Sequence, residues 1–188
     1  MQQKRTIVPS VLRGPKWFAA ALVAFGAIVF SYGAQAETIQ IVALGASNTL
    51  GKGIGLGGSP WPAQLESMLR AKGYDVQVSN EGMNGDTTAG MADRLDRAAP
   101  QGTNLVILNP ANANDRTAGI KSDQDTYMDQ IRSRLTARNV KLIILPALIT
   151  IAPDDHSADG QHFTAEGHAK IAAYVLPQVI SAIRQSAR

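Results

Sequence analysis

Short apolar runs alternate with longer segments of mixed polarity along most of the chain. Runs of this length that are rich in aliphatic residues are typical of buried β-strands. Four strands are predicted in this way, and they span Thr38–Leu44, Tyr74–Asn80, Asn104–Leu108 and Val140–Leu148.

The segments between these runs predict helices. In the first of them, Leu65, Met68 and Leu69 recur at helical spacing, and Gly73 marks the end of the helix. In the last, Pro177 is expected to kink or interrupt the helix, because proline has no N–H group to donate. The predicted helices span Trp61–Gly73, Thr87–Pro100, Ser122–Asn139 and Thr164 to about Arg184.

This alternation of strands and helices predicts one α/β domain, in which a parallel sheet has helices on both faces. Ligand sites in such sheets lie beyond the carboxyl ends of the strands. Functional residues are therefore expected in the loops that follow Leu44, Asn80, Leu108 and Leu148.

Residues 1–36 have the pattern of a secretory signal peptide. A basic start is followed by the apolar stretch Trp17–Phe30 and by the small residues Ala34–Ala36. We expect cleavage after Ala36, which leaves residues 37–188 as a mature domain in the periplasm or outside the cell. The alternative is a retained anchor, but the apolar stretch is short against the roughly 20 residues that span a bilayer.

The charge balance changes when this segment is removed. It carries four of the 18 Lys and Arg residues and none of the 15 Asp and Glu residues, so the predicted mature chain has a net charge of −1. Nucleic acid is therefore not an expected partner. The sequence contains no cysteine, which excludes both disulfides and a Cys-linked lipid anchor.

The loop after the first strand, "ALGASNTLGKGIG" (residues 43–55), is rich in glycine. A P-loop needs four residues between its first glycine and Gly-Lys-Ser/Thr, but here five residues precede the Gly-Lys pair and a glycine follows it. The G-x-G-x-x-G pattern at residues 53–58 begins nine residues beyond Leu44, too far to form the strand-to-helix turn that binds pyrophosphate. The remaining interpretations are that Ser47 is a nucleophile or that it simply caps a helical turn.

A nucleophilic serine needs a base, and histidine is the natural one near neutral pH. His162 is the best of three candidates because Asp159 precedes it by three residues, a spacing that lets a carboxylate reach the near ring nitrogen. His156, beside two aspartates, is expected on a solvated loop. His168 lies inside the last predicted helix, where a structural role is expected.

Acyl transfer also needs hydrogen-bond donors for an oxyanion. The segment "NEGMNGDTT" after the second strand offers the backbone N–H of Gly85, which a ligand can approach closely. The segment "NANDR" after the third strand offers the side-chain amides of Asn112 and Asn114. Each of these residues is also common in turns, but four suitable loops occur in order.

Taken together, "GASNTLG", "NEGMNGDTT", "NANDR" and "DGQH" resemble the four sequence blocks of the SGNH (GDSL-type) hydrolases. The likeness is greatest to the small periplasmic esterases of the thioesterase I/lysophospholipase L1 kind, and it covers essentially the whole predicted mature chain. It implies a three-layer α/β/α sandwich with a central parallel sheet, the flavodoxin-like SGNH hydrolase fold. It also implies catalysis without a metal or a cofactor.

The resemblance implies a role for each residue singled out above. Ser47 is the expected nucleophile, His162 the general base and Asp159 the acid that orients it. The backbone N–H groups of Ser47 and Gly85 and the side chain of Asn114 are expected to form the oxyanion hole.

Three positions depart from the family pattern. Ala46 stands where the family usually has Asp, Asn112 replaces a glycine of the third block, and Phe163 follows the histidine where relatives often have Pro. The absent carboxylate at position 46 implies a different loop geometry or slower turnover. Asn112 and Asn114 are both oxyanion candidates, and Asn114 is favoured because Asp115 follows it, as in the family.

The implied activity is hydrolysis of carboxylic ester or thioester bonds through a Ser-His-Asp triad and an acyl-enzyme. The expected substrates are small-molecule esters, thioesters or lysophospholipids, and no stable membrane span is expected after signal cleavage. Neither the acyl-chain preference nor the oligomeric state follows from the sequence. Two alternatives stay open: a carbohydrate O-deacetylase that uses the same site, and a non-catalytic, exported carbohydrate-binding protein of the same fold.

Overall fold

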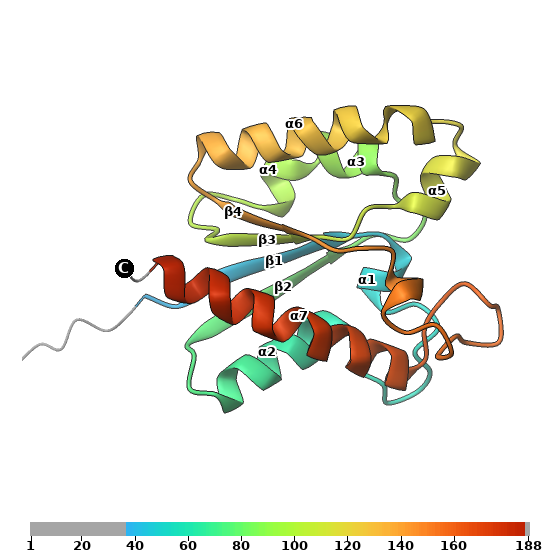
Figure 1. Ribbon diagram of the computed structural model, residues 1–188, viewed down its shortest axis with the longest axis horizontal. Helices are drawn as coiled ribbons and strands as arrows, with labels where there is room; N and C mark the ends of the chain where they lie inside the picture. Colours follow the sequence, from blue (N-terminus) through green and yellow to red (C-terminus); the bar gives the residue numbers. More distant parts are fainter. Residues whose placement is uncertain (1–36, 187–188) are drawn as a thin grey trace, which may run out of the picture. The chain divides into compact units, whose positions relative to one another are not determined.

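The computed structural model describes residues 37–186, and within them four parallel strands form one sheet (Figure 1). The order across the sheet is β2-β1-β3-β4, so β1 pairs on both sides, with β2 from Ile39↔Val76 and with β3 from Ile41↔Leu105. The strands span Ile39–Gly45 (β1), Val76–Gly82 (β2), Leu105–Leu108 (β3) and Lys141–Ile144 (β4).

All four predicted strands are present; the bounds of β1 and β3 differ from the prediction by one residue, and those of β2 and β4 differ by more. β2 begins and ends two residues later than predicted, and its last residue, Gly82, directly precedes the loop that contains Gly85. β4 ends at Ile144 instead of Leu148. Pro146 has no N–H group to donate to a ladder, and Leu148–Thr150 forms a short 3-10 helix instead.

Helices cover both faces of the sheet, as the alternation of elements predicts (Figure 1). The helices α2 and α7 lie on one face, and α3, α4 and α6 lie on the other. Their bounds are Trp61–Ala71 (α2), Thr88–Asp93 (α3), Leu95–Ala98 (α4), Gln124–Ala137 (α6) and Ala165–Ser186 (α7). The described residues therefore form the predicted three-layer α/β/α sandwich.

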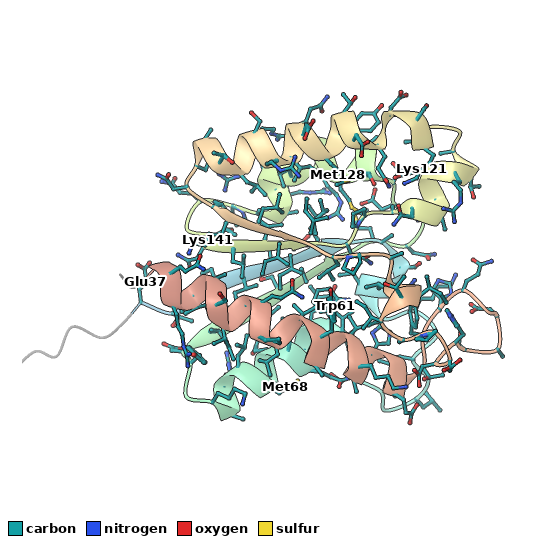
Figure 2. The ribbon with its side chains drawn as sticks, in the orientation of Figure 1. Glu37, Trp61, Met68, Lys121, Met128 and Lys141 are labelled. Atoms are coloured by element: carbon teal, nitrogen blue, oxygen red, sulfur yellow. The ribbon has the colours of Figure 1, made fainter. Side chains whose placement is uncertain are left out.

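The side chains of β1 divide between two apolar clusters, because successive residues of a strand point to opposite faces. Ile41 and Ala43 pack with Trp61 and other residues of α2 and α7. Val42 and Leu44 pack with residues of α3, α4 and α6. Figure 2 shows Trp61 and Met128 on opposite sides of the sheet. Burial on both faces explains why β1 and β3 are almost continuously apolar.

Two helix predictions were wrong in detail. The predicted helix Thr87–Pro100 is two short helices, α3 and α4, separated at Arg94. Pro177 lies inside α7 and does not interrupt it. Pro177 is exposed, so the carbonyl group that loses its partner lies on the solvent side, where water satisfies it.

Two further short helices follow β1 and β3, α1 (Ser47–Leu50) and α5 (Asn112–Thr117). They begin at the carboxyl ends of the strands, where the sequence places the candidate residues. Among residues 37–186, no helix has the length and apolar character needed to cross a bilayer. The predicted signal peptide, residues 1–36, lies outside the described residues.

Candidate active site

Ser47 is the first residue of α1, and one residue, Ala46, separates it from the end of β1. The turn that presents it is held by its own backbone, because the N–H groups of Thr49 and Leu50 both donate to the carbonyl of Ala46 at 3.0 Å. The Ser47 side chain therefore stands at the carboxyl edge of the sheet, half-buried.

His162 lies against this serine, although 115 positions separate the two residues in the chain. Its Nε2 atom is 2.9 Å from the Ser47 hydroxyl oxygen, and its Nδ1 atom is 2.5 Å from a carboxylate oxygen of Asp159. Because an ionised carboxylate can only accept, the proton is on Nδ1, so Nε2 accepts from the serine hydroxyl. The three residues paired in the sequence analysis thus form one continuous hydrogen-bonded chain.

Asp159 is fixed by several donors. Its Oδ1 atom accepts from the Ser157 hydroxyl at 2.7 Å and from the backbone N–H groups of Gln161 and His162 at 2.9 and 3.0 Å. The hydrogen bond from the His162 ring, followed by these contacts, holds the pKa of Asp159 well below its usual value. The group is therefore ionised at neutral pH and keeps the imidazole in one orientation.

The loop that carries both residues is closed at its ends. His156 and Phe163 form an antiparallel bridge, and the Ser157 N–H donates to the His162 carbonyl at 2.7 Å. This closure explains how a loop of the surface presents an acid and a base with little freedom.

The candidate oxyanion donors lie on the two neighbouring loops. Gly85 follows β2 with a φ of +75°, a conformation that favours glycine. Asn114 belongs to α5, and its side-chain amide donates to the backbone carbonyl of Asp86 at 2.6 Å. Asn114 therefore holds the residue next to Gly85, and the second hydrogen of its amide is available to a ligand.

Asn112 is bound differently. Its side-chain oxygen accepts from the Lys121 ammonium at 2.8 Å. Both asparagines line the same cleft, but only Asn114 is joined to the Gly85 loop by a hydrogen bond that the structure records. This difference favours Asn114 as the oxyanion donor.

These side chains border a cleft of about 900 Å³. Ser47, His162 and Asn114 all line it, whereas Asp159 lies behind His162 and Gly85 is not among the lining residues. The other walls come from α1, from the segments after β3 and β4 and from the loop before α7: Asn48, Asn109–Ala111, Asn112, Ala113, Arg116, Thr117, Ala147–Ile149, His156, Gly160, Gln161 and Phe163.

His156 was expected on a solvated loop, and the residues around it are largely exposed, but its ring points inward. The residue lines the cleft, its ring lies 4.7 Å from that of Phe163, and both ring nitrogens are buried without a hydrogen-bond partner among the described residues. The neighbouring aspartates suggested a charged surface, but the bridge to Phe163 turns this ring inward.

His168 has the structural environment expected for it. The side chain is fully buried, and its Nδ1 atom accepts from the backbone N–H of Trp61 at 3.2 Å. Burial, and then the charge of His162, lower the pKa of His168 to about 4. The imidazole is therefore neutral at physiological pH and ties α7 to the start of α2.

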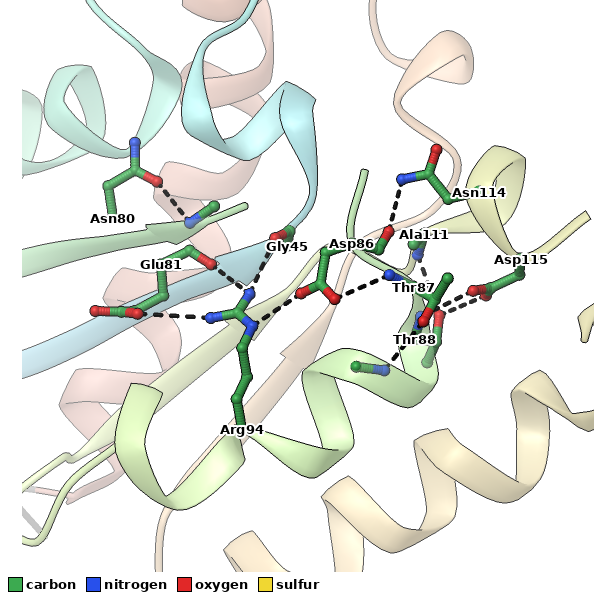
Figure 3. A network of polar contacts seen from close by, with 12 residues as sticks. Gly45, Asn80, Glu81, Asp86, Thr87, Thr88, Arg94, Ala111, Asn114 and Asp115 are labelled. Atoms are coloured by element: carbon green, nitrogen blue, oxygen red, sulfur yellow. Dashed lines mark hydrogen bonds and ion pairs between the residues drawn. The ribbon is translucent and has the colours of Figure 1, made fainter. Parts of the chain in front are cut away.

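The sequence analysis did not identify the buried polar residues behind the site. Asp115 is fully buried and accepts from the N–H and the hydroxyl of Thr88 at 2.8 and 2.6 Å and from the Gln124 amide at 2.6 Å. This cluster anchors α5, and with it Asn114, to α3 through Thr88, as Figure 3 shows, and to α6 through Gln124. The one sequence signal was the position of Asp115 directly after Asn114.

No metal site accompanies these residues in the described part of the chain. No group of three or more His, Cys, Asp or Glu side chains among residues 37–186 is arranged to hold a metal ion.

Comparisons with known proteins identify similar sequences and similar folds. The chain is 26% identical over 119 residues to Esterase TesA of Pseudomonas aeruginosa, which covers 63% of this chain and 58% of TesA. A mutant form of the esterase AlinE4 is 28% identical, with a TM-score of 0.52 over 59% of this chain and 61% of that chain. A crystal structure of TesA has a TM-score of 0.67 at 19% identity, over 76% of this chain and 99% of that chain.

The chain thus spans less than two thirds of the length of the curated relative and of the AlinE4 chain. The sequence model of the GDSL-like Lipase/Acylhydrolase family matches residues 43–174, which is more than half of the chain. The matched segment contains Ser47, Asn114 and His162, which line the cleft. This protein therefore belongs to the GDSL-like Lipase/Acylhydrolase family.

Proposed function

We propose that this protein is an exported serine esterase that hydrolyses carboxylic ester or thioester bonds. The observation that carries the proposal is the hydrogen-bonded chain from the Ser47 hydroxyl through His162 to Asp159, with contacts of 2.9 and 2.5 Å. A serine paired with an oriented imidazole is the arrangement that activates a hydroxyl for attack on a carbonyl.

In the proposed reaction, the Ser47 oxygen attacks the carbonyl carbon while His162 Nε2 takes the hydroxyl proton. Asp159 stabilises the imidazolium that forms. The oxyanion accepts hydrogen bonds from the backbone N–H groups of Ser47 and Gly85 and from the Asn114 amide. When the intermediate collapses, His162 gives its proton to the leaving alcohol or thiol, and an acyl-enzyme remains.

Water completes the cycle by the same route. His162 takes a proton from water as the water oxygen attacks the acyl carbon, and it returns that proton to the Ser47 oxygen when the acid departs. The low pKa of Asp159 supports this sequence, because the carboxylate stays ionised while the imidazole cycles between its neutral and charged forms.

A small ester or thioester suits the cleft best. A volume of about 900 Å³ is in the range that holds a small-molecule ligand. Ala147, Leu148 and Ile149 offer an apolar wall for an acyl group near Ser47. Lysophospholipids belong to the same substrate class.

A second candidate is removal of acetyl groups from a carbohydrate. The cleft is also lined by side-chain amides and a guanidinium group, from Asn48, Asn109, Gln161 and Arg116. These groups can bind sugar hydroxyls. The same triad then releases acetate from the polymer.

The test is hydrolysis of a substrate panel by the purified protein and by Ser47→Ala. We expect the parent protein to hydrolyse short p-nitrophenyl esters and acyl thioesters, and the variant to lose at least ~10³-fold in kcat. Ser67→Ala, at an exposed position on α2, is the matched control and should leave kcat unchanged.

Three outcomes separate the candidates. Release of acetate from acetylated xylan without activity on longer acyl chains favours the deacetylase. Full activity in Ser47→Ala excludes Ser47 as the nucleophile. Failure of a fluorophosphonate probe to label Ser47 in the folded parent protein supports a non-catalytic carbohydrate-binding protein instead.

Export is a separate part of the proposal and rests on the pattern of residues 1–36 alone. We expect the full-length chain, expressed in a bacterium, to appear in the periplasm or the medium with Glu37 as its first residue. N-terminal sequencing of the recovered protein tests this, and an intact N-terminus in the membrane fraction indicates a retained anchor.

A further inference from the structure

Arg94 makes the most extensive set of buried polar contacts near the proposed site. It lies at the break between α3 and α4, and only 7% of its side chain is exposed. Its Nε atom donates to the Asp86 carboxylate at 2.8 Å, and one terminal nitrogen donates to the backbone carbonyls of Gly45 and Glu81 at 3.2 and 2.8 Å. Figure 3 shows the guanidinium group at the centre of these partners.

The partners of Arg94 lead to each segment that carries a proposed oxyanion donor. Gly45 precedes Ser47 by two residues. Asp86 follows Gly85 directly, and its own backbone carbonyl accepts the hydrogen bond of the Asn114 amide at 2.6 Å. The Gly45 carbonyl also accepts from the N–H of Met83, at 3.1 Å. The end of β1 is therefore held both by the backbone of the loop after β2 and by the side chain of Arg94.

We propose that Arg94 and Asp86 form a positioning pair that sets the spacing of the three oxyanion donors of Ser47, Gly85 and Asn114. The inference rests on the proposed esterase function and adds to it a residue that acts through others. Neither Arg94 nor Asp86 lines the cleft, so neither is a catalytic residue.

Stability alone is a poor explanation for this pair. Both side chains are nearly buried, at 7% and 10% exposure, and removing two charges from water costs free energy that their attraction only partly returns. An apolar pair of similar size would hold the helix as well. The planar guanidinium differs because it donates in several fixed directions at once, which a lysine ammonium on its flexible stem does not reproduce.

The residue before the serine makes this support more important. Ala46 has no polar group in its side chain, and it is buried in the apolar cluster of α3, α4 and α6. Asn80 and Asn109 hold the later residues of this turn through Leu50 and Thr49, whereas Arg94 holds its start through the Gly45 carbonyl.

Gly90 provides a second, independent indication. A Cβ atom at this position of α3 would lie 2.2 Å from the Asp86 carboxylate oxygen. Glycine costs about 1 kcal/mol of helix stability relative to alanine. The chain thus has a poor helix former at a position where a side chain would displace the Asp86 carboxylate.

The experiment compares the parent protein with Arg94→Lys, Asp86→Asn and Gly90→Ala, using p-nitrophenyl acetate. We expect each variant to lose roughly 10- to 100-fold in kcat, less than the loss of a whole oxyanion donor, with KM changed less than about threefold. Arg138→Lys is the matched control, because Arg138 joins α6 to the chain near α4 through Asp96 and the Ala99 carbonyl, far from the donor loops. Its kcat should stay within about twofold of the parent value.

A double-mutant cycle with Asn114→Ala separates positioning from general loosening. If Arg94 acts through the donors, Arg94→Lys should lower kcat by a much smaller factor in the Asn114→Ala protein than in the parent protein. Equal costs in both backgrounds overturn the inference, as does a kcat loss no larger than that of Arg138→Lys. Thermal unfolding identifies any variant that fails to fold, and the other two then decide the question.

The inference and the proposed function fail in different ways. An active parent protein that is inactivated by Ser47→Ala but tolerates all three variants contradicts only the positioning pair. A parent protein that hydrolyses no ester or thioester contradicts both.

Discussion

Asn112 and Asn114 stand two positions apart and have different hydrogen-bond partners, and on this basis we propose different roles for them. The side-chain oxygen of Asn112 accepts a hydrogen bond from the Lys121 ammonium. The Asn114 amide is held by a backbone carbonyl beside Gly85. At the scale of single residues, the hydrogen-bond partner is therefore our reason for proposing Asn114, and not Asn112, as the oxyanion donor.

Replacement of each asparagine by alanine tests this difference. We expect Asn114→Ala to lower kcat by ~10²- to 10³-fold, because the loss of one oxyanion donor removes stabilisation specific to the transition state. Asn112→Ala should change kcat by less than about threefold. Steady-state hydrolysis of a p-nitrophenyl ester measures both effects, and equal losses would show that the assignment to Asn114 is wrong.

At the scale of elements, the helices show where local signals compete with tertiary packing. The segment Thr87–Pro100 has the composition of one helix, yet it breaks at Arg94, whose side chain reaches the ends of β1 and β2. Pro177 shows the opposite case. Val175 and Val179 on either side of it are buried in the core, and α7 continues past a residue that normally ends a helix.

Pro177→Ala should therefore stabilise the protein. Alanine restores a backbone N–H that can bond within α7, and proline inside a helix costs about 3 kcal/mol relative to alanine. Because α7 already accommodates the ring, we expect a smaller gain of about 1 to 2 kcal/mol in the free energy of unfolding. Urea denaturation measures the change, with Ala173→Gly, an exposed position on the same helix, as a control that should destabilise. A loss of stability in Pro177→Ala would show that the ring itself contributes packing.

At the scale of the whole molecule, the buried side chain of His168 makes the stability of the fold depend on pH. His168 joins α7 to the beginning of α2 and has no carboxylate partner among the contacts that the structure records. Burial lowers its pKa from 6.5 to about 4, so the folded protein favours the neutral ring. Its contribution to stability is complete above pH 6.5 and is lost as the pH falls towards 4, because only the unfolded chain takes up the proton easily.

The expected loss between pH 7 and pH 4 is on the order of 2 kcal/mol in the free energy of unfolding. His168→Asn does not titrate, and its side-chain oxygen can accept from the same Trp61 N–H. Chemical denaturation at several pH values should therefore show a smaller fall for the variant than for the parent protein. Protonation of Asp159 adds a further loss only at lower pH, since its pKa is also held down. Parallel curves for the two proteins would exclude His168 as the cause.

The sequence by itself determined the number of strands and their order along the chain, their parallel arrangement, and the pairing of Asp159 with His162. These features depend on local periodicity and on spacings of a few residues, which are visible along a chain. The tertiary structure decided the rest: the 2.9 Å contact between Ser47 and His162, the inward position of His156, and the buried network around Arg94. Those features join loops that are distant in sequence, and they depend on the packing of helices against both faces of one sheet, which no local pattern encodes.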